Sequence, residues 1–384
     1  NNPAIMFVSP VSGKVLSINR GDRRKLLEVV VQANQSNEYK SFDISNTASV
    51  DSTIKIMLEA GVWPCVKQRP FNTIANPADK PKSIHISTFD TSPLAPDYSF
   101  IIKQNLEEFK KGVSILSQLS VGGVNLNIKN LESDIQLFAS VENVRKNYFM
   151  GPHPAGNMGI QIHHLEPINK GEVVWVLNPQ DVIIIGRLFL KGIYDAQKIV
   201  AITGNISKPG YLKTLIGAKV SSIVNNQSIE FDSNRIISGN PLTGEKLTQT
   251  GYIGYYDSQI TVLEEGTKPE FMGWIQPGLK KFSASRTFLS WLTPKKSYSL
   301  NTNLNGGERA FVFTGVYEKV LPMNIYPMQL LKAIIVNDID KMEQLGIYEV
   351  VEEDFALCEF VCPSKIEIQS IIRQGLDTIK KEFS

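Results

Sequence analysis

The sequence predicts a mixed α/β chain built from several domains. At 384 residues it is too long for one hydrophobic core. Strand-like patterns dominate the first thirty-odd residues and the stretch after Lys198, whereas strands alternate with helices in between. Helical spacing of apolar residues prevails from about Thr287. We therefore expect four regions, over residues 1–35, 36–195, 196–265 and 266–384.

Composition excludes several classes of protein. The chain has 40 basic and 38 acidic residues and a net charge of +2, without the concentrated basic excess that nucleic-acid binding usually needs. No stretch reaches the ~18 consecutive apolar residues of a spanning helix, and no signal peptide precedes the opening Asn1-Asn2-Pro3. Three cysteines favour a reducing compartment over a disulfide framework. Any contact with a membrane is therefore expected to be peripheral or through partners.

The first region reads as β structure. A strand at Phe7–Val8, a Pro/Gly turn, a second strand through Ile18 and a third over Leu26–Val31 are expected. The run Ser9-Pro-Val-Ser-Gly-Lys-Val resembles the second half of a biotinyl/lipoyl-like barrel-sandwich hybrid. Only one half is present, which predicts further sequence ahead of the first residue.

The second region alternates helices and strands, which predicts a mostly parallel, Rossmann-like sheet. A helix is expected at Ser52–Ala60, with Ser52 as its cap and Gly61 as its stop. The expected elements that follow are a strand at Ile84–Phe89, a long helix at Phe100–Leu119, and short strands at Val124–Ile128, Ile135–Ser140 and Val173–Leu177. No G-x-G-x-x-G run joins a strand to a helix, so binding of NADH or flavin is disfavoured.

The last two regions differ in character. Strands at Ile199–Thr203, Ile236–Pro241 and Gln259–Leu263, with a Pro-Gly turn at Pro209-Gly210, predict a β-grasp module (SLBB, ubiquitin-like). The fourth region opens as a loop-rich segment, for which a return to the barrel-sandwich is one option. A C-terminal helical domain follows, with helices expected at Gln329–Val336, Asp338–Leu345 and Lys365–Phe383.

Three of the four histidines lie within twelve residues, in a segment read as a Gly/Pro-rich loop from Gly151 to His164. A quinone ring is flat and apolar, and its two carbonyls need hydrogen-bond donors. The side chains in and just before this segment that suit such a ring are the candidate quinone-binding residues, namely Tyr148, Phe149, Met150, His153, His163 and His164. The alternative is a structural loop whose histidines bond to local backbone groups.

Other sequence motifs give weaker evidence of a functional site. Cys358 and Cys362, the latter followed by proline, resemble part of an iron–sulfur motif, but Cys65 is the only other thiol. We interpret the pair as a degenerate cluster remnant and expect no metal site. Ser285 lacks the surroundings of a nucleophile, and no catalytic acid–base pair of carboxylates stands out.

Longer signatures, spread in order along almost the whole chain, resemble one family, the A subunits of the bacterial sodium-translocating NADH:quinone oxidoreductase. They are Phe7-Val-Ser-Pro-Val-Ser-Gly-Lys-Val-Leu-Ser-Ile-Asn-Arg-Gly, Gly151-Pro-His-Pro-Ala-Gly, Gln180-Asp-Val-Ile-Ile-Ile-Gly-Arg-Leu-Phe, Phe271-Met-Gly-Trp-Ile-Gln-Pro-Gly, Asn305-Gly-Gly-Glu-Arg-Ala and Ala356-Leu-Cys-Glu-Phe-Val-Cys-Pro. The family is also similar to the flavin-binding subunit of respiratory complex I. The resemblance implies that this family has lost the nucleotide loop and the cluster ligands of that subunit.

The resemblance implies a peripheral subunit on the cytoplasmic side of the bacterial inner membrane. Its complex couples NADH oxidation and ubiquinone reduction to Na⁺ export. The resemblance further implies that this subunit helps bind quinone, whereas flavins and a 2Fe-2S centre belong to partner subunits. Two other classes stay open, a purely structural docking subunit and a free-standing NAD(P)H or flavin enzyme. Saturable ubiquinone binding separates the first of these from a quinone-binding subunit.

Overall fold

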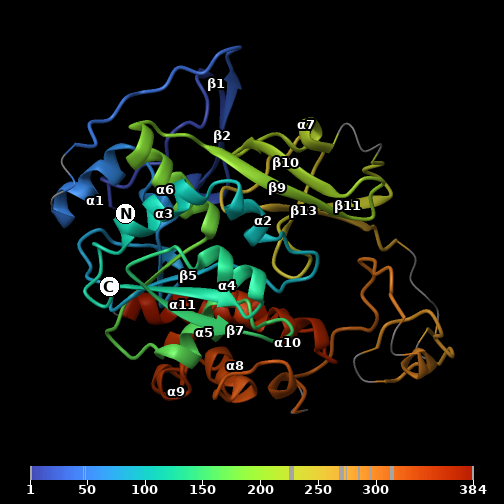
Figure 1. The fold of residues 1–384 in the computed structure, drawn as a ribbon. Coiled ribbons are helices and arrows are strands. Elements are labelled where there is room, and N and C mark those ends of the chain that lie inside the picture. The colour runs from blue at the N-terminus through green and yellow to red at the C-terminus, as the bar shows by residue number, and fades with distance from the viewer. Residues whose placement is uncertain are drawn as a thin grey trace.

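The computed structural model describes residues 2–45, 47, 49–224, 229–267, 272–273, 275–283, 286–293, 296–311 and 315–382. Figure 1 shows four parts: an N-terminal hairpin, an α/β domain, a second sheet beside it, and a helical domain below. In the described part of the chain, no helix is long and apolar enough to cross a bilayer. Phe271, Trp274, Ser285 and Phe383, which belong to the motifs and elements expected from the sequence, lie outside the described residues.

The N-terminal region is a two-stranded antiparallel hairpin of β1 (Gly13–Arg20) and β2 (Leu26–Ala33), joined through the short helix η1 (Asp22–Arg24). The expected strand at Phe7–Val8 is wrong, because this segment packs on the other domains instead of pairing with a strand. The Phe7 ring meets Tyr255 edge-on at 5.2 Å, and the Val8 side chain fills the space beside Gly61.

The α/β domain is built on a six-stranded sheet in the order β4-β3-β8-β5-β6-β7. Neighbours among β8, β5, β6 and β7 are parallel, and β3 and β4 add an antiparallel edge. This confirms the expected mostly parallel sheet. The strands are β3 (Lys67–Arg69), β4 (Thr73–Ile74), β5 (Ile84–Ser87), β6 (Val124–Lys129), β7 (Val144–Phe149) and β8 (Val174–Leu177).

Helices cover this sheet. They are α1 (Val50–Glu59), η2 (Trp63–Cys65), α2 (Tyr98–Lys103), α3 (Leu106–Leu116), α4 (Glu132–Phe138), α5 (Met158–Leu165) and α6 (Pro179–Lys191). The first of them is capped by Ser49 and not by Ser52, which instead completes a capping box, while Gly61 ends the turn at φ +71° as expected.

Two expectations for this domain are wrong. The long helix over residues 100–119 is broken at Asn105, whose side-chain oxygen accepts a hydrogen bond from Arg187 on α6 (2.8 Å). The break allows α3 to pack against α6 at Gly112 and Gly186, where a Cβ on Gly186 would lie 1.7 Å from a carbonyl oxygen. The strand expected at Ile135–Ser140 is helix α4, because its apolar side chains repeat at helical spacing and Phe138 is buried.

The third region confirms the β-grasp prediction. Its sheet has the order β10-β9-β13-β11-β12, with β9 and β13 parallel at the centre. The elements are β9 (Gln197–Gly204), β10 (Gly210–Leu215), α7 (Val220–Val224), β11 (Asn234–Ser238), β12 (Glu245–Leu247) and β13 (Gln259–Glu264). Apolar side chains from α7 pack on one face of this sheet and form its core.

The fourth region opens with extended chain. The described part of residues 266–311 forms no named strand, and Figure 1 shows it projecting away from the N-terminal hairpin. The helical domain then has its own buried core, as expected. The opening segment contains the short helix η4 (Leu289–Leu292). The helices of the helical domain are η5 (Tyr317–Lys319), α8 (Pro327–Ile335), α9 (Ile339–Gln344), η6 (Ile347–Glu349), η7 (Glu352–Phe355), α10 (Ala356–Val361) and α11 (Ile368–Glu382).

Candidate functional site

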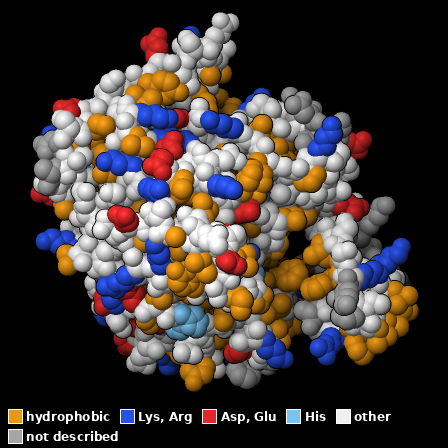
Figure 2. Space-filling view, in the orientation of Figure 1, with side chains coloured by type: hydrophobic (Ala, Val, Ile, Leu, Met, Phe, Trp, Pro, Cys, Tyr) orange, Lys and Arg blue, Asp and Glu red, His pale blue; other side chains and the backbone are white. Residues whose placement is uncertain are grey.

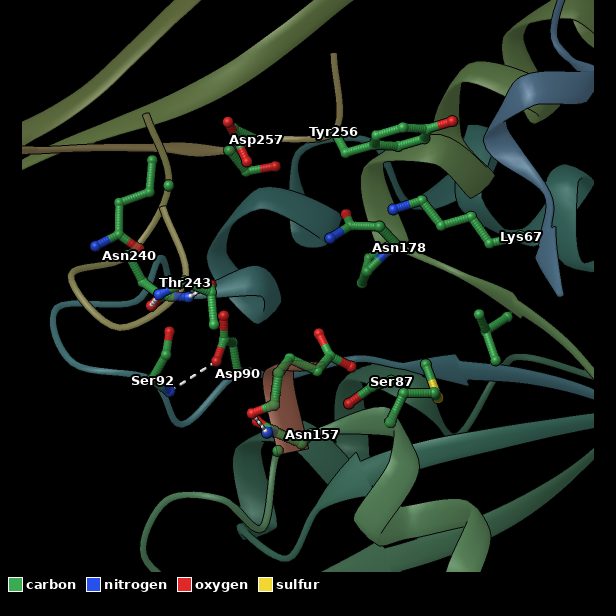
Figure 3. Close-up of a pocket in the computed structure, with 18 of the residues that line it drawn as sticks. Lys67, Ser87, Asp90, Ser92, Asn157, Asn178, Asn240, Thr243, Tyr256 and Asp257 are labelled. Carbon is green, nitrogen blue, oxygen red and sulfur yellow. Dashed lines mark hydrogen bonds between the residues drawn. The ribbon is translucent and has the colours of Figure 1, made fainter. Parts of the chain in front are cut away.

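A cavity of about 440 Å³ lies where the α/β, β-grasp and helical domains meet. The α/β domain supplies most of its wall, from β3, from the ends of β5 and β8 and from the start of α6. The loop before β13 and the loop after β11 close a second side, and Glu352, Glu353 and Gln369 of the helical domain close a third. Figure 3 shows these side chains converging on one space.

Sheet topology explains why the cavity is here. From β5 the chain runs on to β6 and then β7, and it returns across the sheet to form β8 on the other side of β5. The loops after β5 and β8 therefore leave in opposite directions and open a crevice between them. Ligands of open α/β sheets bind in the crevice at this point, outside the carboxyl ends of the strands.

The turn from β8 into α6 has little room for a phosphate. Asn178 caps the helix by accepting a hydrogen bond from the Gln180 backbone N–H (3.0 Å), and it donates to the Tyr98 hydroxyl (2.9 Å). The first helical residue is Pro179, which has no N–H, and Asp181 brings a carboxylate into the first turn. A phosphate at a helix N-terminus needs free backbone N–H groups and no competing negative charge.

Lys67 and Tyr256 form one end of the cavity. The Lys67 ammonium lies 3.7 Å from the centre of the Tyr256 ring, a cation–π contact. Figure 3 shows its tip directed toward the Asn178 side chain. Burial lowers the pKa of Lys67, against the opposing effect of nearby acids.

Two carboxyl groups of the cavity are strongly desolvated. Asp181 is 2% exposed, and its Oδ1 has no hydrogen-bond partner among the described residues. Burial raises the pKa of Asp181, with Lys198 and Lys67 opposing the shift. Asp90 accepts a hydrogen bond from the Ser92 backbone N–H (2.7 Å), and burial raises its pKa as well. Both carboxyls are thus shifted toward the neutral acid.

Arg69 ties the helical domain to the wall of the cavity. Its guanidinium donates to Asp354 Oδ2 (3.1 Å) and to Glu353. Arg69 and Asp354 are both buried, so the pair is desolvated. Opposite them, Gly159 on α5 leaves the space that Asp354 occupies, because a Cβ there would lie 2.2 Å from its carboxylate.

Comparison with known proteins agrees with this architecture. Models of three domain families match: the NqrA N-terminal barrel-sandwich hybrid domain at residues 1–34, the NqrA second alpha/beta domain at 48–194, and the NQRA C-terminal domain at 199–249. Among curated relatives, the A subunit of Na(+)-translocating NADH-quinone reductase from Neisseria meningitidis serogroup B is 39% identical over 99% of this chain and 86% of its own length. The counterpart from Vibrio anguillarum is 40% identical over the same shares.

The chain belongs to the NqrA family. This confirms the family inferred from the sequence signatures, and with it the barrel-sandwich, α/β and SLBB assignments. The chain of a solved NAD⁺-reducing [NiFe]-hydrogenase also aligns, at 11% identity and a TM-score of 0.44, over 88% of this chain and 62% of its own. A similarity that weak supports no conclusion about function.

Within this NqrA-family chain, the structure separates the six residues expected to bind quinone. His153 lines the cavity, where its Nδ1 shares a hydrogen bond with the Thr91 hydroxyl (3.1 Å) and burial lowers its pKa. Tyr148 and Phe149 end strand β7 and Met150 follows it, and none of the three is among the residues that line the cavity. Tyr148 is half exposed and Met150 is 82% exposed.

The other two histidines contact the helical domain. The segment expected to be one loop becomes helix α5 from Met158 onwards, which turns His163 and His164 away from the cavity. His163 bonds to Glu349 (2.6 Å) through Nδ1 and accepts from the Asn324 backbone N–H (3.0 Å) through Nε2. His164 Nε2 bonds to the Pro322 carbonyl (3.0 Å). These partners are far along the chain, whereas the structural alternative expected bonds to local backbone groups.

The two C-terminal cysteines lie in the core of the helical domain. Cys358 and Cys362 are fully buried, and the sulfur of Cys362 is 2.9 Å from the Tyr317 hydroxyl. Burial raises the pKa of Cys358 to about 12, so it carries no thiolate at neutral pH. Over the described ranges, no group of three or more potential metal ligands occurs. The interpretation as a cluster remnant remains a prediction.

Sequence reasoning missed most of the polar residues of the cavity. Lys67, Asp181 and Tyr256 come from three parts of the chain that are far apart. Asp181 lies in the signature that begins at Gln180, but nothing in that signature indicated a role in a cavity. A usable signal was present at Asp90 and Asn178, which directly follow expected strands at the end of a parallel sheet.

Proposed function

We propose that this chain is the NqrA component of a membrane-bound complex that couples NADH oxidation and ubiquinone reduction to Na⁺ export, and that it binds quinone in the three-domain cavity. The relatives that support this are named as A subunits of Na(+)-translocating NADH-quinone reductase. Their identity extends over almost the whole chain, including the regions that form the cavity. The partners are then the other subunits of the complex, and the site of action is the cytoplasmic face of the inner membrane.

The lining of the cavity is the observation that carries the quinone assignment. Flat or apolar side chains stand beside donors suited to carbonyl oxygens, namely the Lys67 ammonium, the Asn178 amide and His153. The apolar part includes Phe89, Pro96, Tyr98, Met158, Leu177 and Tyr256. A volume of about 440 Å³ lies within the range of small-molecule sites and suits a single substituted ring.

The same cavity gives reasons to place flavin and iron–sulfur centres in partner subunits. The β8–α6 turn presents proline and aspartate where a phosphate needs backbone N–H groups. We expect the purified full chain to show no visible flavin absorbance and no bound iron. A stoichiometric flavin or cluster in the purified chain would contradict this part of the proposal.

A purely structural docking subunit is the second candidate, and exposed apolar surface favours it. Both strands of the N-terminal hairpin expose large apolar side chains, among them Leu16, Leu27 and Val29. The segment 272–304 exposes others, such as Leu279 and Leu304, and Figure 2 shows apolar side chains gathered on this projecting lobe. The two roles are compatible, since docking surfaces and cavity lie on different elements.

Equilibrium binding of ubiquinone-1 to the full chain tests the proposal. Thr243 is exposed at the edge of the cavity, so Thr243→Trp places a large ring there at little cost to folding. We expect saturable binding by the wild type and affinity at least about tenfold lower in this variant. Thr250→Trp, an exposed change in the same domain outside the cavity lining, is the matched control and should bind as the wild type does. Absence of saturable binding by the wild type would favour the docking role alone.

A further inference from the structure

Lys67 and Asp181 form a pair of charged side chains at one end of the cavity. Each is close enough to influence the ionisation of the other, and Asp181 also acts on Tyr256, whose ring lies under the Lys67 ammonium. In the part of the chain that the structure describes, Lys67 makes no ion pair, and no basic side chain is within ion-pair distance of Asp181. The two groups thus face the cavity without satisfying each other.

This arrangement is unusual for an acid in the first turn of a helix. Such acids favour the N-terminus of a helix and usually remain in water. Asp181 is instead 2% exposed, with Oδ1 unbonded among the described residues. Burying an uncompensated carboxylate is costly, so the group is stable here as the neutral acid or beside a hydrogen-bond donor.

We propose that Lys67 and Asp181 hold one oxygen of the bound quinone ring, Lys67 as a donor and Asp181 as the group that shares a proton with that oxygen. The inference rests on the proposed quinone-binding function and names the residues of its polar end. As the neutral acid, Asp181 donates to a quinone carbonyl. As the carboxylate, it accepts from a hydroquinone hydroxyl. An oxygen with two lone pairs can meet both residues at once.

Neighbouring groups fit this assignment. Asp181 is surrounded by one thiol, two ammonium groups and several phenols, which are Cys65, Lys67, Lys198, Tyr98, Tyr194, Tyr255 and Tyr256. The Lys198 ammonium donates one hydrogen bond to the Tyr255 carbonyl (3.1 Å). Burial raises the pKa of Tyr98, Tyr255 and Tyr256 as it does that of Asp181, so the phenols stay neutral. Among these named groups Asp181 is the carboxyl, and burial raises its pKa, which favours the neutral acid that donates to a carbonyl.

Quinone and hydroquinone are therefore expected to differ in the number of protons that the protein takes up or releases when each of them binds. A quinone carbonyl favours the protonated acid, so binding of quinone draws up to one proton from solvent onto Asp181, and its affinity falls as pH rises. A hydroquinone hydroxyl favours the carboxylate, so binding of hydroquinone draws no proton or releases one.

The test is titration calorimetry of the full chain with ubiquinone-1 and with ubiquinol-1, each in two buffers of different ionisation enthalpy. We expect the wild type to take up a fraction of a proton with ubiquinone and none with ubiquinol. Asp181→Asn should bind ubiquinone within about threefold of wild type, because an amide still donates, but with no proton uptake. Lys67→Met should weaken binding by about tenfold or more, and Lys67→Arg should restore part of it.

Matched controls use charges outside the cavity. Asp195→Asn removes another buried carboxylate, and Lys82→Met removes a half-buried lysine that pairs with Glu172. Both should bind and take up protons as the wild type does. If the wild type binds neither ligand, the proposed function fails. If it binds ubiquinone without proton uptake, or if Lys67→Met binds as tightly as the wild type, the inference is overturned while quinone binding stands.

Discussion

Lys67 and Arg69 lie two positions apart on the short strand β3, on the same face, and both line the cavity. The two terminal nitrogens of Arg69 pair with two acids of the helical domain, whereas among the described residues Lys67 has only the face of Tyr256. One cation therefore joins domains, and the other keeps its donors directed at the cavity. Burial alone therefore does not distinguish a charge that serves the cavity from a charge that stabilises the fold. The partners of each side chain make that distinction.

Arg69→Met should give the largest effect. It leaves Asp354 buried without its cation, and burial already raises the pKa of that carboxyl. Breaking a buried pair from one side costs about 3–5 kcal/mol of unfolding free energy. Urea denaturation measures it, with Arg235→Met as the control, because the Arg235–Glu265 pair is partly exposed and should cost about 1 kcal/mol or less. Equal losses in the two variants would contradict the conclusion that the Arg69 ion pairs hold the helical domain to the α/β domain.

His163→Ala should come next. The change removes the partner of Glu349 and of the Asn324 backbone N–H, at a cost of about 1–3 kcal/mol. Ubiquinone-1 binding should not change, because His163 lies outside the cavity lining. His153→Ala should do the reverse, with little loss of stability and weaker binding. The roles assigned to the two histidines are wrong if His163→Ala weakens binding and His153→Ala does not.

Lowering the pH should reveal the contribution of Glu166 to the unfolding free energy, which we expect to be smaller than the effects of the substitutions above. A hydrogen bond from His85, foremost, lowers the pKa of Glu166 to about 2 from its ordinary value of 4.5. Because the folded pKa is depressed, this stabilisation is complete above pH 4.5 and is lost as pH falls toward 2. Plotted against pH, the unfolding free energy of Glu166→Gln should therefore fall less steeply over that window. Parallel curves for variant and wild type would exclude the contribution.

Lys67→Met should have the smallest effect on stability. Burial lowers the pKa of Lys67, so its charge is held at a cost, and no ion pair among the described residues is lost with it. The unfolding free energy should stay within about 1 kcal/mol of wild type, or rise. A loss as large as that of Arg69→Met would show that Lys67 is structural and would remove the contrast between the two cations.

The sequence predicted most elements of the fold because their periodicities are local. The strands at residues 84–89 and 124–128 and the β-grasp strands follow from apolar and β-branched runs. Two of the errors arose where tertiary contacts decide. The helix over residues 100–119 breaks because Asn105 bonds to Arg187, and Phe7 leaves the hairpin to pack on Tyr255. Neither contact partner is near in sequence.

The site was harder to predict than the fold. Because three histidines are close in sequence, they were predicted to form one site. His153 does line the cavity, but helix α5 turns His163 and His164 toward the helical domain. The side chains that define the cavity come together only when β3, α6 and the loop before β13 meet. Such a convergence leaves no spacing pattern in one sequence.

Quinone binding in the three-domain cavity is tested most sharply by photolabelling of the full chain. The probe is a ubiquinone analogue that carries a photoreactive group on its ring, and peptide mapping locates the label. We expect label on the cavity segments, above all residues 65–72, 87–98 and 176–181, and competition by ubiquinone-1. Competable label confined to residues 144–150 or to the N-terminal hairpin would contradict a quinone site in this cavity.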